Sequence, residues 1–169
     1  MKISDLLKKT GPAFSFEFFP PKNNDGFNQL FQSIDQLKTW NPAFISVTYG
    51  AGGSTRSKTI ELVGRIKNVI GLESMAHLTC VGHSSDEIHT ILKSLQDQGV
   101  DNLLALRGDP PKGDKNFTKP EDGFGFASEL VNFSYQNFPF CIGVAGYPEG
   151  HPECSDFSQG LVHLKNKVL

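Results

Sequence analysis

The segment that decides the fold covers residues 75–107 and reads MAHLTCVGHSSDEIHTILKSLQDQGVDNLLALR. It begins and ends with a short β-rich run. Between the two runs, four apolar residues recur at spacings of three and four: Ile88, Ile91, Leu92 and Leu95. This spacing predicts an amphipathic helix. Ser84 and Glu87 form a capping-box pattern at its start, and Gly99 is a typical stop. The segment therefore predicts two parallel strands joined by a helix.

The same alternation continues on both sides of this segment. The β-rich runs cover residues 14–19, 44–49, 75–80, 103–107 and 140–145. Helical patterns separate them over residues 27–37, 60–70 and 88–95, with weaker ones over 127–135 and 157–164. Repetition of this kind predicts parallel strands joined by right-handed crossovers. Two architectures fit: an open, doubly wound sheet and a (β/α)8 TIM barrel.

The side-chain alternation within the runs favours the barrel. Each run has an apolar face and a face that is polar or small; in the fourth run, Leu104 and Leu106 are expected opposite Ala105, Arg107 and Asp109. A doubly wound sheet favours apolar residues on both faces, whereas a barrel gathers polar site residues at its C-terminal mouth. The residues expected to converge there are Ser15, Glu17, Thr48, His77, Arg107, Asp109 and Tyr147.

Length and composition limit the possibilities further. The chain has 169 residues, whereas a complete barrel has about 250, so the expected fold is a single incomplete TIM-barrel domain over 1–169, truncated after five strand–helix units. A hydrophobic content of 38% supports a packed core and excludes wholesale disorder. Sixteen basic against eighteen acidic residues, with no basic run, exclude a nucleic-acid partner on electrostatic grounds.

The expected location is the cytoplasm. No stretch approaches the roughly 18 apolar residues of a membrane span, and the first residues lack the apolar region of a secretory signal. Three cysteines are an odd, sparse count that does not suggest a disulfide framework.

Two of the strand runs carry candidate acid–base or metal-binding groups. Glu17 stands among several phenylalanines, and a desolvated carboxyl group keeps its proton near neutrality, as a general acid must. The alternative is a structural glutamate paired with Arg107 or a lysine. The spacing His77-x-x-Cys80-x-x-His83 resembles a metal-ligand set, but strand alternation sends His77 and Cys80 to opposite faces, so no metal site is expected.

Three loops that follow strands are further candidates. Residues 48–56 form a Gly-rich loop that either binds a phosphate or is a flexible connection. Arg107-Gly108-Asp109 is either a ligand site, with Gly108 allowing close approach of the backbone, or a turn with a surface ion pair. Residues 147–153 either clamp a ligand or form a rigid turn.

Five motifs together resemble the bacterial-type methylenetetrahydrofolate reductase family. They are FSFEFFPPK at 14–22, SVTYGA at 46–51, HLTC at 77–80, ALRGD at 105–109 and YPEGHPE at 147–153. They occur in the family's order and spacing, and the match covers nearly the whole chain.

The resemblance implies an FAD-containing TIM barrel that takes hydride from NADH or NADPH. It implies ping-pong reduction of 5,10-methylenetetrahydrofolate to 5-methyltetrahydrofolate, and a possible homo-oligomer. By motif, Glu17 matches the general acid and Asp109 the carboxylate near flavin and pterin. The implied flavin contacts are Thr48, Tyr49, Ala51, His77, Arg107, Gly108, Asp109, Ala127, Tyr147, His151 and Lys167. Gly160 and His163 depart from residues that some family members carry at flavin-contacting positions.

Two alternatives to this enzyme remain. The chain could be a non-catalytic flavin-binding or assembly fragment, because three barrel units of the family pattern are missing from it. A barrel glycosidase using Glu17 and Asp109 would satisfy a two-carboxylate mechanism. However, Trp40 is the only tryptophan available as an aromatic sugar platform.

Overall fold

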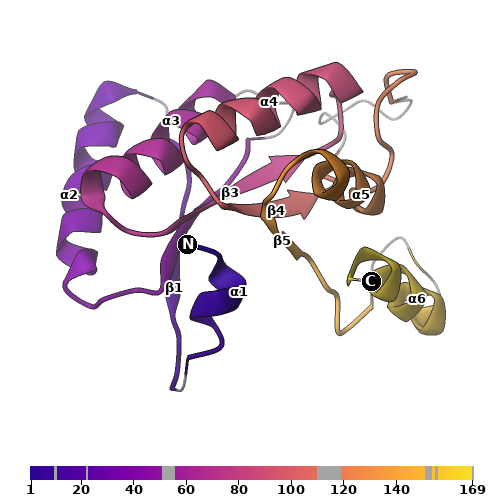
Figure 1. Ribbon diagram of the computed structural model, residues 1–169, viewed down its shortest axis with the longest axis horizontal. Coiled ribbons are helices and arrows are strands. Elements are labelled where there is room, and N and C mark those ends of the chain that lie inside the picture. The colour runs from indigo at the N-terminus through magenta and orange to yellow at the C-terminus, as the bar shows by residue number, and fades with distance from the viewer. Residues whose placement is uncertain are drawn as a thin grey trace.

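The computed structural model describes residues 1–9, 11–21, 23–50, 56–109, 119–150, 154 and 156–168 (Figure 1). Five strands form one sheet: β1 (Ser15–Phe18), β2 (Phe44–Val47), β3 (Ser74–Thr79), β4 (Asn102–Leu106) and β5 (Cys141–Val144). Every neighbouring pair is parallel, and the order in the sheet is the order in the chain, β1-β2-β3-β4-β5.

This strand order separates the two architectures that the sequence leaves open. A doubly wound sheet reverses its strand order at a switch point, where its ligand binds. A barrel adds each new strand on the same side of the previous one. The described strands show no reversal, which confirms the prediction of parallel strand–helix units arranged as in part of a TIM barrel.

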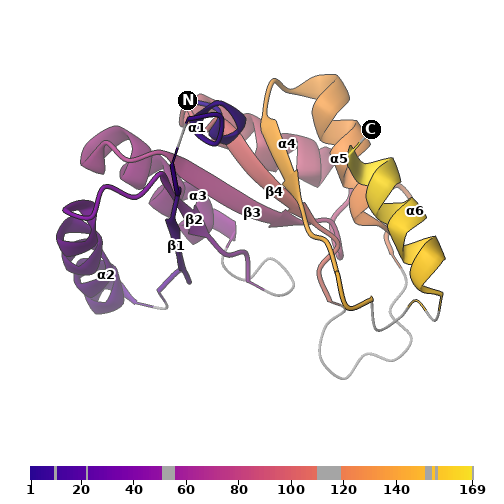
Figure 2. The same cartoon turned by 90° about the horizontal axis from the view of Figure 1, so that it is seen from below.

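The helices alternate with the strands along the chain. They are α1 (Ile3–Leu6), α2 (Asn24–Lys38), α3 (Arg56–Arg65), which continues into a π-helical segment over Ile66–Ile70, α4 (Ser85–Asp97), α5 (Ala127–Asn137) and α6 (Phe157–Val168). Figure 1 shows α3, α4 and α5 over one side of the sheet, and Figure 2 shows α6 beside α5 at the β5 end.

The hydrophobic core lies between one face of the sheet and the helices. Its fully buried strand residues are Ile45, Val47, Ala76, Leu78, Leu103 and Ala105, and its helical residues include Leu62, Ile66, Ile88, Leu92, Leu95 and Leu130. We call this side of the sheet the helix-covered face. The opposite side, which carries Glu17, Ser46, His77 and Leu104, is called the inner face.

The register of β4 corrects one expectation from the sequence. His77 pairs with Leu104, and Thr79 pairs with Leu106, so both leucines share the inner face with His77. Ala105 is fully buried on the helix-covered face instead. The prediction failed because the run Leu103–Leu106 is apolar throughout, so its alternation carries no sign of which side is which. Arg107 and Asp109 follow the end of the strand, where alternation no longer applies.

The amino ends of the central strands are held by a polar network. The buried Asn102 side chain accepts from the Ile3 backbone N–H at 2.8 Å and donates to Glu73 at 3.0 Å. Lys67 donates to Glu73 and to Asp101 beside it, at 3.0 and 2.5 Å. In a barrel this end serves stability, which leaves the opposite end for ligands.

Among the described helices, none has the length and hydropathy of a membrane span.

Candidate functional site

Glu17, Ser46 and His77 lie together on the inner face, on three neighbouring strands. Glu17 and Ser46 are register partners on β1 and β2, and the Ser46 hydroxyl donates to Glu17 Oε2 at 3.4 Å. Nε2 of His77, on β3, lies 3.4 Å from the same carboxylate oxygen. The predicted meeting of Glu17 and His77 on one side of the sheet is therefore observed.

The predicted desolvation of Glu17 by phenylalanines is not observed. Its side chain is 53% exposed, because strand alternation sends Phe16 and Phe18 away from the inner face. His77 differs: its side chain is only 8% exposed, and burial lowers the pKa of its imidazole, although the Glu17 carboxylate opposes that shift. Within the described residues, His77 Nε2 has no hydrogen-bond partner.

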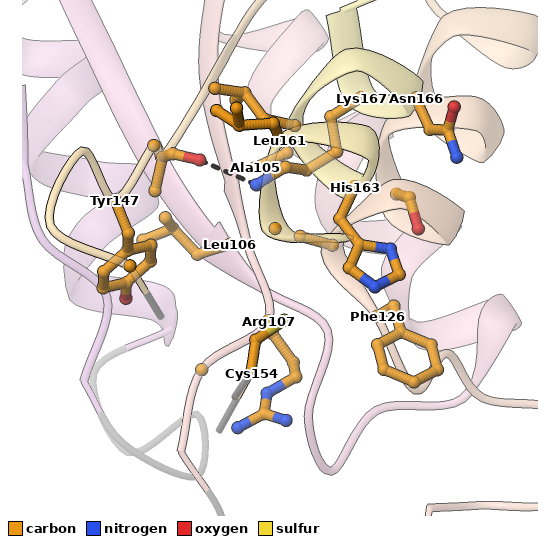
Figure 3. A pocket seen from close by; sticks show the side chains of 18 of the residues that line it. Ala105, Leu106, Arg107, Phe126, Tyr147, Cys154, Leu161, His163, Asn166 and Lys167 are labelled. Carbon is orange, nitrogen blue, oxygen red and sulfur yellow. Dashed lines mark hydrogen bonds between the residues drawn. The ribbon is translucent and has the colours of Figure 1, made fainter. Parts of the chain in front are cut away.

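A pocket of about 570 Å³ lies between the carboxyl ends of β4 and β5 and the helices α5 and α6 (Figure 3), and Glu17, Ser46 and His77 are not among its lining residues. It brings together several of the predicted flavin contacts: Arg107, Gly108, Asp109, Ala127, Tyr147 and Lys167. These residues come from two strand ends and two helices that are distant in the sequence. The pocket therefore gathers about half of the predicted contact set in one place.

Arg107 and Lys167 bring positive charge to the pocket, and several of its other described lining residues are apolar. Arg107 lines it from the end of β4, and Lys167 lines it from α6. Lys167 Nζ donates to the backbone oxygen of Ala145 at 2.7 Å, a bond drawn in Figure 3. Burial lowers the pKa of Lys167. Leu106 and Leu161 contribute apolar side chains. Such a pocket suits an anionic ligand with flat apolar parts.

Gly108 is required by the local backbone. Its φ is 80°, in the left-handed region that side chains with a Cβ rarely adopt. A Cβ at this position would lie 2.7 Å from Cβ of Thr79. The close approach is thus to β3 within the protein, which differs from the approach to a ligand that the sequence suggests.

Thr48 and Tyr49 follow β2 and are held from the helical side. The Thr48 carbonyl accepts from the Thr59 hydroxyl on α3 at 3.1 Å. Tyr49 packs against the core, and its hydroxyl lies 3.1 Å from Nε2 of His83. Burial raises the pKa of Tyr49 to about 12. The Tyr49 hydroxyl is therefore directed toward the β3–α4 connection.

Two predicted contacts, Ala51 and His151, lie outside the described residues. The sequence reasoning missed several pocket residues: Phe126, Cys154, Phe157 and Asn166. Part of the signal was present, since Gly160, His163, Leu164 and Lys167 follow helical spacing and all line the pocket from α6. Among the described residues, no cluster of three His, Cys, Asp or Glu side chains has the geometry to hold a metal ion.

Comparison with known proteins identifies relatives over nearly the full chain. The family model described as methylenetetrahydrofolate reductase matches residues 2–169. The chain is 42% identical over 178 residues to methylenetetrahydrofolate reductase (NADH) 1 of Arabidopsis thaliana, covering 99% of this chain and 30% of the relative. It is 44% identical over 175 residues to methylenetetrahydrofolate reductase 1 of Schizosaccharomyces pombe, covering 99% and 29%.

A bacterial relative shows the same relationship. The chain is 42% identical over 154 residues to 5,10-methylenetetrahydrofolate reductase of Escherichia coli strain K12, covering 91% of this chain and 50% of the relative. The chain thus spans between about a third and a half of the length of these relatives. The match over residues 2–169 shows that the chain belongs to the methylenetetrahydrofolate reductase family.

Proposed function

We propose that this chain supplies the FAD site and the general acid of a methylenetetrahydrofolate reductase. The proposed reaction reduces 5,10-methylenetetrahydrofolate to 5-methyltetrahydrofolate, with NADH or NADPH as the hydride donor. The observation that carries the proposal is the pocket, which collects Arg107, Gly108, Asp109, Ala127, Tyr147 and Lys167 from separate elements. From its family we also propose that the protein forms a homo-oligomer and is located in the cytoplasm.

The residues of the pocket fit FAD. Its volume of about 570 Å³ lies within the range of ordinary cofactor sites. Arg107 and Lys167 provide positive charge for a pyrophosphate, and Arg107 also offers a planar fork of N–H donors. The apolar lining residues and the ring of Tyr147 suit flat aromatic groups. When bound, FAD supplies hydride transfer from the nicotinamide to the folate.

Glu17 is proposed to hold the proton that opens the folate methylene bridge. The Ser46 hydroxyl orients Oε2 of Glu17 at 3.4 Å, and the nearby His77 ring is too buried to gain a proton easily. Protonation of the bridge nitrogen makes its adjacent carbon a better hydride acceptor. Because the Glu17 side chain is half exposed, it is accessible to a bound substrate.

Asp109 is proposed to stabilise positive charge on the folate intermediate. It lines the pocket at the end of β4 and is itself exposed, so its carboxylate is available to a ligand. A fixed anion next to a developing cation lowers the energy of that cation.

The two half-reactions test this assignment separately. Anaerobic reduction of the bound flavin by NADH or NADPH is recorded by absorbance, and reoxidation is then started with the folate substrate. Glu17→Gln keeps the shape of the side chain and removes the acid. We expect flavin reduction to continue and folate-driven reoxidation to slow by about 10²-fold or more. Glu61→Gln, on the exposed side of α3, is the matched control and should leave both steps unchanged.

The other outcomes of this experiment are equally informative. If Glu17→Gln reoxidises as fast as the unaltered chain, the proposed acid is wrong. If the unaltered chain binds FAD but performs neither half-reaction, it is a non-catalytic flavin-binding or assembly fragment. The half-exposed Glu17 side chain is the specific observation that keeps this second function open.

A further inference from the structure

His83 is a buried histidine that the proposed reaction does not use. Its side chain is 7% exposed and lies in the connection between β3 and α4. Nε2 lies 3.1 Å from the Tyr49 hydroxyl, and the two rings meet edge to face with their centroids 5.9 Å apart. On the opposite edge of the ring, Nδ1 lies 3.7 Å from Oε2 of Glu87.

Glu87 places a negative charge near Nδ1 of His83, at a distance too long for a hydrogen bond. Its carboxylate is fixed at the start of α4, because Oε2 accepts from the Ser84 backbone N–H at 3.0 Å. A negative charge beside Nδ1 favours a proton on Nδ1, which leaves the Nε2 lone pair free to accept a hydrogen bond. With the proton on Nδ1, the Tyr49 hydroxyl donates to Nε2 and the phenol is held in one orientation.

The same carboxylate also contacts the start of α3. Arg56 lies 3.7 Å from Oε1 of Glu87 and donates to the Glu87 backbone oxygen at 3.4 Å. Tyr49 precedes the connection from β2 to α3, and Arg56 begins that helix. His83 and Glu87 thus tie both sides of the β2–α3 connection to the first turn of α4.

We propose that His83 is a positioning residue for the flavin site: as the Nδ1–H tautomer it accepts from Tyr49 and fixes the end of β2. This inference rests on the proposed function together with the FAD contacts that the family motifs imply for Thr48 and Tyr49, two residues that do not themselves line the pocket of Figure 3. The Thr48 carbonyl is already held by Thr59. With Tyr49 held by His83, two successive residues at the mouth are anchored before a ligand arrives, so binding loses less conformational freedom.

The functional test is a set of FAD titrations at about pH 7.5, where a buried histidine is neutral. His83→Leu and Tyr49→Phe each remove one side of the hydrogen bond. We expect each variant to bind FAD about 2- to 10-fold more weakly, and the double variant to be no weaker than either alone. His83→Gln should restore most of the affinity, because its side-chain oxygen is able to accept from Tyr49.

Ile88→Val is the matched control, since it removes one buried methyl group from α4 and leaves both members of the Tyr49–His83 hydrogen bond in place. It should destabilise the fold modestly and leave FAD affinity unchanged. Additive losses in the double variant, unaltered binding by His83→Leu, or an equal loss in Ile88→Val would each overturn the inference. If the unaltered chain takes up no FAD, the proposed function fails first.

A second measurement tests the anchor without any flavin. Long-range ¹H–¹⁵N correlation spectra of the chain distinguish the two neutral histidine tautomers. The inference requires His83 to carry its proton on Nδ1. A proton on Nε2 would show that Tyr49 is not the donor and would overturn the inference, whatever the flavin affinity.

Discussion

Gly108 follows the carboxyl end of β4 and lines the pocket. Its backbone lies in the left-handed region, with φ at 80°. Gly108→Ala should lower the free energy of unfolding by about 1–3 kcal/mol, because a Cβ there is strained and meets Thr79 at 2.7 Å. Denaturant unfolding measures this loss. Gly160→Ala is the control: a Cβ at Gly160 meets nothing within 4 Å, and alanine in a helix should stabilise by up to about 1 kcal/mol.

In the part of the chain that the structure describes, the buried His77 and His83 make stability depend on pH near neutrality. Burial lowers the pKa of both His77 and His83; the carboxylates of Glu17 and Glu87 oppose this, and Arg56 adds to it at His83. As the pH falls through 6.5, these two histidines therefore take up protons in the unfolded chain before they do so in the folded chain. Stability should be full above that pH and should decrease as the pH falls toward the lowered native values.

Thermal unfolding between about pH 7.5 and pH 5.5 measures this slope. His83→Gln removes one of the two groups and should make the decrease shallower. The backbone hydrogen bond from Ser84 lowers the pKa of Glu87, so its contribution is lost only below 4.5, outside this window. A variant with an unaltered slope, or a chain that gains stability on acidification, would contradict the assignment.

At the level of single residues, the sequence predicts which side chains share a face better than it predicts how they are solvated. Period-two alternation places Glu17 and His77 on the inner face, as observed. The exposure of the Glu17 side chain depends on which other segments pack over the inner face. A local sequence pattern does not contain that information. The contact of Tyr49 with His83 also joins separate segments, so neither residue suggests it alone.

Among the elements, α4 has the most explicit start signal. The Ser84 hydroxyl accepts from the Glu87 backbone N–H at 3.2 Å, and the Glu87 carboxylate accepts from the Ser84 backbone N–H. Ser84→Ala should lower the free energy of unfolding by about 0.5–2 kcal/mol, because a backbone donor loses its partner. Ser94→Ala, on the same helix, removes only a bond to the Thr90 carbonyl and should have a much smaller effect. If chemical denaturation shows equal losses of unfolding free energy for Ser84→Ala and Ser94→Ala, the proposed contribution of the Ser84 cap is wrong.

The elements also show where sequence patterns stop being informative. The capping box and Gly99 delimit α4 because the signals act within a few residues of each other. The prediction of which face of β4 points inward fails because the run that carried it, Leu103–Leu106, is apolar on both faces. The polar residue that marks the inner face of β4 is Asn102, which pairs with Met75 and stands one residue before that run.

At the scale of the molecule, sequential parallel strands and helices of regular spacing were predictable, because they follow from repeated local patterns. The pocket was only partly predictable. Arg107, Gly108 and Tyr147 follow strands directly, where barrel geometry expects ligands. Phe126, Phe157 and Asn166 reach the pocket from α6 and from the segment before α5, and their approach depends on how the helices pack.

The most direct test of the account is an FAD titration of the chain and of two lysine variants on α6. Lys167 lines the pocket and donates to Ala145, whereas Lys165 carries the same charge on the same helix without lining it. The account predicts that the unaltered chain and Lys165→Met retain FAD and its visible absorbance after dialysis. Lys167→Met should bind about 10-fold more weakly or worse, because a charged donor is lost. A colourless unaltered chain, or equal affinities for the two variants, would contradict the claim that this pocket holds the flavin.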